Sequence, residues 1–228
     1  MLSVLKVEFE KLFRTKSFWI VLAFLSLITS AVAVTRSVSL AGSVGGVNPA
    51  VPKADNGYYF EDNSPYAISL YNVWIGSLVG DLLFTTVFYF ILPLAAALPF
   101  SFSLLDENRN GYLRQMSLKK GQQRYYLAKY LVTFCSGFLL AVIPLVINII
   151  ITACYIPAYT PDPLEQIYSG QYYGRYLSNI FYSNPFLFMM IFVLIPGIFC
   201  GLWADLSMCL SLFIQNTFRN PDLSNIMK

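Results

Sequence analysis

Four long, predominantly apolar segments of the chain contain no charged residue. They cover residues 18–35, 82–105, 130–157 and 185–204. At about 1.5 Å of helical rise per residue, segments of this length reach across the hydrocarbon core of a bilayer. Inside lipid, a helix satisfies all of its own backbone hydrogen bonds. The pattern therefore predicts an all-α integral membrane protein, in which residues 1–228 form a single transmembrane domain with a bundle of about four transmembrane helices.

The segment before the first span, residues 1–16, mixes apolar and charged positions with a helical period. One face of the helical wheel gathers the large apolar side chains, and the other face carries charges. The apolar set is Leu2, Leu5, Phe9, Leu12 and Phe13, and the charged set is Lys6, Glu10, Lys11 and Arg14. This pattern predicts an amphipathic helix lying flat in the membrane interface, in contact with anionic lipid headgroups. The alternative is a plain cytoplasmic extension of the first span.

Basic residues are unevenly distributed between the segments that separate the predicted spans. Of the 15 Lys and Arg residues, only Arg36, Lys53 and Arg175 follow the first or third span. The positive-inside rule then places both termini in the cytoplasm and the protein in the cell membrane. A cleaved signal peptide ending near Ala33 is the competing interpretation, and the acidic residues of the long leading segment disfavour it.

Composition agrees with a membrane protein and weakens an enzymatic interpretation. The chain is 57% hydrophobic and 12% charged, whereas soluble domains carry about 25% charged residues. It has no histidine, no Cys-x-x-Cys spacing and no phosphate-binding loop of the Gly-x-x-x-x-Gly-Lys type. We therefore expect no catalytic site, no metal and no cofactor. Because the basic residues gather on one predicted side of the membrane, the net charge of +3 indicates lipid contact and no nucleic acid partner.

The predicted cytoplasmic loop, residues 106–124, has the features of a short helix between two spans. Acidic residues stand at its start, where the helix dipole favours them, and Gly121 precedes the third span. Tyr112, Leu113 and Met116 share one face of such a helix. Two interpretations stay open for this face: it enters a groove on a partner, or it packs against the protein's own helices.

Asp205 interrupts the apolar C-terminal part of the chain. A carboxylate inside the membrane often marks an ion or substrate pathway, whereas a carboxylate at the inner interface is simply solvated. The sequence favours the interface, because residues 185–204 already cross, and it leaves Asp205 as the candidate pathway residue.

The order of elements resembles the permease subunit of type-2 ATP-binding-cassette (ABC) exporters, the ABC-2 type permease family. The residues that carry the resemblance are the basic elbow Glu8-x-x-Lys11-Leu12-Phe13-Arg14-x-Lys16-x-Phe18-Trp19 and the stretch Glu107-x-x-x-Gly111, which leads to Lys129. The resemblance implies a coupling-type loop that docks on a separate ABC ATPase subunit, with Glu107, Gly111, Tyr112, Leu113 and Met116 as its partner-binding residues. It also implies a homo- or heterodimer of permease subunits that exports a substrate with ATP hydrolysed elsewhere.

The chain departs from that family in one respect. Related permeases usually have six spans, whereas this chain stops where a fifth would begin. We therefore keep a second hypothesis from another class: a non-transporting membrane scaffold, an immunity or assembly protein, or an inactive truncated permease. No short motif identifies the substrate.

Overall fold

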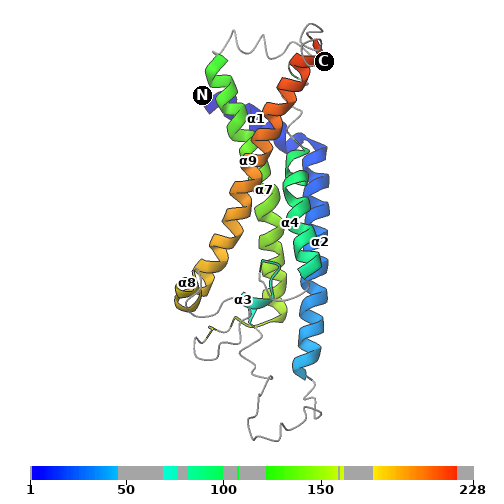
Figure 1. The fold of residues 1–228 in the computed structure, drawn as a ribbon, viewed down its shortest axis with the longest axis vertical. Coiled ribbons are helices and arrows are strands. Elements are labelled where there is room, and N and C mark those ends of the chain that lie inside the picture. The colour runs from blue at the N-terminus through cyan, green and yellow to red at the C-terminus, as the bar shows by residue number, and fades with distance from the viewer. Residues whose placement is uncertain are drawn as a thin grey trace, which may run out of the picture. The chain divides into compact units, whose positions relative to one another are not determined.

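The computed structural model describes residues 2–45, 69–76, 82–99, 107, 122–158, 160–161 and 177–219. Within these ranges the chain forms helices and no strands, so the all-α prediction is confirmed for them. The helices are α1 (Leu2–Arg14), α2 (Lys16–Gly45), α3 (Leu70–Val73), α4 (Leu82–Ala97), α7 (Gln122–Tyr155), α8 (Ser178–Ser183) and α9 (Pro185–Arg219), as Figure 1 shows.

Three of these helices are long and apolar enough to cross a membrane. The qualifying segments are Lys16–Ser39 of α2, Gln123–Tyr155 of α7 and Pro185–Ser211 of α9. α4 is apolar but shorter, so the fourth span stays a prediction. Large apolar side chains are exposed along the long helices, for example Ile20, Leu27 and Ile195. Lipid is the solvent in which such surfaces are stable, and this indicates a membrane protein.

Cα packing divides the chain into two compact units. Unit 1 contains Met1–Leu25, Val87–Ile143 and Leu194–Lys228, and unit 2 contains Ser26–Thr86 and Pro144–Val193. The division falls at Pro144 in α7 and just before Pro196 in α9. A proline removes one backbone hydrogen bond from a helix, so α7 and α9 change units close to a gap in their backbone ladder. α2 also changes units, between Leu25 and Ser26, without a proline.

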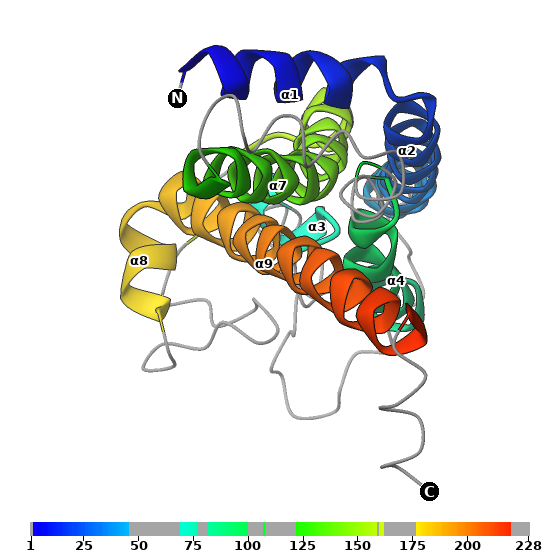
Figure 2. The same cartoon turned by 90° about the horizontal axis from the view of Figure 1, so that it is seen from above.

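In unit 1, the chain turns sharply between α1 and α2. Figure 2 shows α1 from the side and the adjoining turns of α2 nearly end-on. Thr15 lies between the helices, and its hydroxyl donates to the carbonyl of Lys11 at 2.8 Å. The indole N–H of Trp19 donates to the carbonyl of Phe13 at 2.7 Å. These bonds satisfy carbonyl groups that the end of α1 would otherwise leave without a partner.

Close helix packing in unit 1 depends on glycines of α7 and α9. A Cβ atom added to Gly137 of α7 would lie 2.6 Å from the carbonyl oxygen of Cys200 in α9. A Cβ atom added to Gly201 of α9 would lie 2.7 Å from the ring of Phe134 in α7. Small residues let membrane helices approach closely, and here they bring the backbones of α7 and α9 together.

Unit 2 is held by an asparagine that links three segments. The side-chain amide of Asn148 in α7 donates to the carbonyl of Thr29 in α2 at 2.8 Å, and its oxygen accepts from the backbone N–H of Ile75 at 3.0 Å. Asn148 is fully buried, as is the neighbouring ring of Trp74. The amide therefore satisfies the backbone N–H of Ile75, just after α3, and ties it to the middle of α2.

Candidate functional site

Four charged residues and one tyrosine meet in unit 1. Glu8 and Lys11 come from α1, Tyr125 and Lys129 come from α7, and Glu107 comes from the segment between α4 and α7. We call this group the ionic cluster. It joins three parts of the chain that are distant in sequence.

Each lysine of the ionic cluster contacts both carboxylates. The Nζ atom of Lys129 lies 2.8 Å from Oε2 of Glu8 and 3.0 Å from Oε1 of Glu107. The Nζ atom of Lys11 lies 2.8 Å from Oε1 of Glu8 and 2.9 Å from Oε1 of Glu107. The hydroxyl of Tyr125 donates to Oε2 of Glu107. Two anions and two cations thus share a closed set of charge-assisted bonds.

Helical spacing explains how the sequence places these groups. Glu8 and Lys11 are three residues apart and share one side of α1, and Tyr125 and Lys129 are four residues apart and share one side of α7. Apolar contacts hold the two helices together, because Val4 packs in a buried group with Tyr125, Ala128 and Met208. The charged groups therefore meet at the edge of an apolar interface.

Burial makes the pairing obligatory. The side chains of Lys129 and Glu8 are 0% and 1% exposed, and that of Glu107 is 13% exposed. A buried charge without a partner is strongly destabilising, so a balanced set of two carboxylates and two ammonium groups is the arrangement that these helices tolerate. Moving one member away from the others would expose an unpaired buried charge.

The cluster shifts the protonation equilibria of its accessible members. Burial alone would raise the pKa of the Glu107 carboxyl, but the charge of Lys129 and the hydrogen bonds that Glu107 accepts outweigh it and lower the pKa below the ordinary 4.5. Burial alone would lower the pKa of Lys11, and its bonds to Glu8 and Glu107 raise it above the ordinary 10.5. Both shifts favour the charged forms at neutral pH.

The lowered pKa of Glu107 predicts how the stability of the protein depends on pH. Because the pKa of Glu107 is lower in the folded protein than in the unfolded chain, its contribution is present above pH 4.5 and is lost as the pH falls through the folded pKa. We expect acid to destabilise the wild-type protein more than a Glu107→Gln variant, as measured by unfolding in detergent from neutral pH into the acid range. Glu10→Gln, at an exposed position of α1, should keep the wild-type profile. Parallel profiles for the wild type and Glu107→Gln would contradict the assignment.

The structure describes only one of the five residues predicted to bind a partner. Glu107 lies in the ionic cluster, whereas Gly111, Tyr112, Leu113 and Met116 lie outside the described residues. Their role in partner binding stays a prediction.

The predicted apolar face of α1 is placed in detail. Leu12 is fully buried, Leu5 and Phe9 are partly buried, and Phe13 is exposed; Leu2 belongs to α1, and its side chain lies outside the described set. The buried stripe of α1 is Val4, Glu8 and Leu12, with a charged residue at its centre. These residues are four positions apart, and this spacing is the feature of the sequence that indicates a shared side of the helix for Glu8, Val4 and Leu12. Residence of α1 in the membrane interface stays a prediction.

Asp205 lies in α9, within the segment that can cross a membrane. Its Oδ1 atom is buried and has no hydrogen-bond partner among the described residues. A pathway role for this carboxylate stays a prediction.

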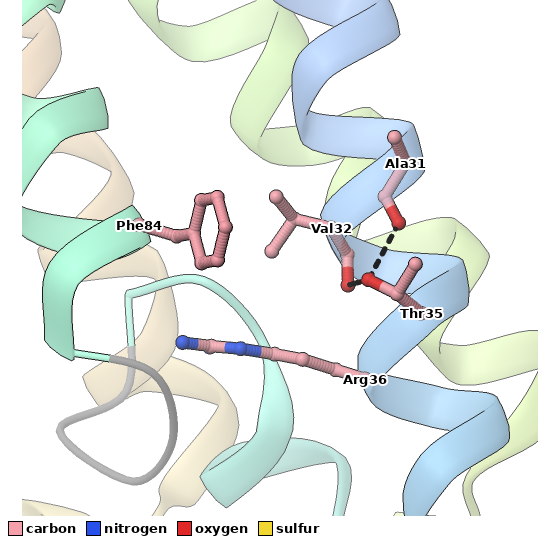
Figure 3. A pocket seen from close by; sticks show the side chains of 5 residues that line it. All are labelled: Ala31, Val32, Thr35, Arg36 and Phe84. Carbon is pink, nitrogen blue, oxygen red and sulfur yellow. Dashed lines mark hydrogen bonds between the residues drawn. The ribbon is translucent and has the colours of Figure 1, made fainter.

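Unit 2 contains a second polar feature, shown in Figure 3. Arg36 of α2 lines a cavity of about 210 Å³ together with Val32, Thr35 and Phe84. Its guanidinium donates to the hydroxyl of Thr85 at 2.9 Å and to the carbonyl of Val73 at 3.5 Å. These contacts join α2 to α3 and α4 within unit 2, and we interpret Arg36 as a structural residue.

No protein-family model, curated protein or solved structure matches this chain. Among the residues that the structure describes, no group of three or more Cys, Asp or Glu side chains is arranged to hold a metal ion. The class of the protein therefore rests on its architecture. Three helices long and apolar enough to span a bilayer indicate a helical membrane protein.

Proposed function

We propose that this chain is the permease subunit of an ABC export system of the type-2 class, which moves a substrate across the cell membrane while a separate ATPase subunit hydrolyses ATP. In this proposal two permease subunits pair, both termini are cytoplasmic, and the loop 106–124 docks on the ATPase. The ionic cluster is the observation that supports it most directly. Glu8, Lys11, Glu107 and Lys129, which belong to the two stretches that resemble this family, contact one another there.

The cluster suits a loop that transmits force. Glu107 stands near the start of the predicted docking loop and is bonded to α1 through Lys11 and to α7 through Lys129. Because separating these buried charges is unfavourable, a push on the loop would move α1 and α7 with it rather than break the contacts. Motion of the ATPase subunits would thus reach a membrane-crossing helix through Glu107.

Removal of residues 108–122 tests the docking step. We expect this deletion to abolish co-purification of the protein with its proposed ABC ATPase subunit, because it removes the predicted docking surface. A deletion of the same length within the predicted outer loop, residues 47–61, is the control and should leave co-purification intact. Undiminished ATPase binding by the first deletion would count against the proposal. Full function without any ATPase would favour the scaffold hypothesis.

Glu107→Gln tests the coupling step separately. The variant keeps the shape of the side chain but loses charge-assisted hydrogen bonds, each worth about 1.5–3 kcal/mol. Because the Glu107 carboxylate is bonded to Lys11 and Lys129, we expect the other loop residues to keep ATPase binding while ATP-driven transport in proteoliposomes falls about tenfold or more. Glu10→Gln is the matched control on the exposed side of α1. Equal transport by Glu107→Gln and the wild type would show that the cluster does not couple the loop to the helices.

A further inference from the structure

Unit 1 carries an apolar groove that the proposed function does not use. It has a volume of about 700 Å³ and lies between α2, α4 and α9. Its walls include Ile20 and Phe24 of α2, Leu94 of α4 with Leu98 just after it, and Trp203 and Ser207 of α9. Apart from Ser207, these side chains are apolar or aromatic, so the groove offers almost no hydrogen bonds to a polar ligand.

The groove opens onto the exposed apolar surface of the unit. Ile20 is 67% exposed, Leu94 is 52% exposed and Trp203 is 40% exposed, and both α2 and α9 contribute from segments that can cross a membrane. An open apolar groove between helices that can cross a membrane is accessible to acyl chains, and a flexible hydrocarbon chain can fill its irregular walls. A hydrocarbon chain is therefore the occupant that the shape and lining of the groove fit.

One end of the groove carries positive charge. Lys16 is the first residue of α2 and stands one helical turn before Ile20 on the same side of the helix. Lys16 is exposed and forms no ion pair with any described residue. Cations at the end of a membrane-crossing helix attract anionic lipid headgroups.

From these observations we infer that the groove binds one acyl chain of an anionic phospholipid whose headgroup phosphate is held by Lys16. Charge complementarity selects this occupant over a second copy of the chain. A two-fold pairing of copies through the groove would bring the same cations of both copies together at one end, where they would repel. The inference stands independently of any ATPase partner.

The test uses purified full-length protein in phosphatidylcholine nanodiscs. Photoactivatable phosphatidylglycerol with a diazirine on its acyl chain is compared with phosphatidylcholine carrying the same group, and labelled peptides are identified by mass spectrometry. We expect phosphatidylglycerol to label residues 91–98 and 203–207 preferentially. Lys16→Gln should reduce that labelling about five-fold, the effect of roughly 1 kcal/mol per cation near a membrane surface. Arg124→Gln, an exposed cation on α7, should leave it unchanged.

A second pair of variants tests the groove itself. Leu94→Trp places a large ring at the groove wall and should reduce labelling by both lipids. Phe90→Trp, at an exposed position of α4 outside the groove, should not. Lys16→Arg should keep wild-type labelling, which separates loss of charge from loss of folding.

Three results would overturn the inference. Equal labelling by the two lipids, together with no effect of Lys16→Gln, would show that Lys16 does not bind the headgroup. Undiminished labelling of Leu94→Trp would show that the chain does not enter the groove. Efficient disulfide cross-linking of two copies through a cysteine placed at Leu94 would identify a second protein copy as the occupant.

Discussion

Replacing Lys129 with methionine is expected to destabilise the folded protein by about 3–5 kcal/mol, because it leaves two buried carboxylates with a single ammonium group between them. Lys129 is fully buried, and its ammonium group contacts both Glu8 and Glu107. Lys11 alone would then face two carboxylates. Equilibrium unfolding of the purified protein in mixed detergent micelles, followed by circular dichroism, measures the loss.

A double variant separates charge balance from packing. Glu8→Leu combined with Lys129→Met removes one anion and one cation and leaves Lys11 paired with Glu107. Replacing a whole buried ion pair by apolar residues is often neutral, so the double variant should be more stable than Lys129→Met alone. Lys6→Met, at an exposed position of α1, should change the free energy of unfolding by no more than about 0.5 kcal/mol. Purely additive effects of the two substitutions would refute the coupling.

Gly137→Ala is expected to destabilise the packing of α7 against α9 by about 1–3 kcal/mol, through overpacking. The new methyl group would lie 2.6 Å from the backbone oxygen of Cys200 and 3.0 Å from the Cβ atom of Ala204. A backbone oxygen cannot rotate away, so the helices must separate. Detergent unfolding and the melting temperature both report this change.

Gly197→Ala is the matched comparison. Its added methyl group would meet the side chains of Val142 at 2.7 Å and Phe138 at 3.0 Å, and no backbone atom is among its nearest neighbours. Side chains relieve such contacts by changing rotamer, so we expect a smaller loss than for Gly137→Ala. Equal losses at the two positions would mean that backbone contact does not limit the approach of α7 and α9.

The Lys129 and Gly137 predictions both concern how movement of Glu107 would reach the helices of unit 1. The ionic cluster ties α1 and Glu107 to the first turns of α7, and the glycine contacts tie the following turns of α7 to α9. Within unit 1, displacement of Glu107 therefore has a continuous path of close contacts to α9. Coupling of the loop to the membrane helices would depend on this path. We therefore expect variants that weaken the ionic cluster or the glycine contacts to lose transport activity even where they still fold.

Several parts of the architecture were readable from the sequence. Long uncharged apolar runs predict helices because lipid offers no hydrogen bonds to an open backbone. The described residues of these runs are helical except at residues 98–99 and 156–157, which follow the ends of α4 and α7. The runs at 18–35, 130–157 and 185–204 each overlap a helix that is long and apolar enough to cross a membrane. The fourth span, the membrane orientation and the docking role of Tyr112, Leu113 and Met116 stay predictions.

The ionic cluster could not be predicted from the sequence pattern. Glu8 and Lys129 are separated by 121 positions, and at sequence level each resembles an ordinary solvated charge beside an apolar segment. Periodicity shows which residues share one side of a helix, but it carries no information about which helix covers that side. The sequence by itself determined that the chain forms apolar helices suited to lipid. Only the tertiary structure decided which charges are buried together, because pairing depends on contacts between helices that no local pattern encodes.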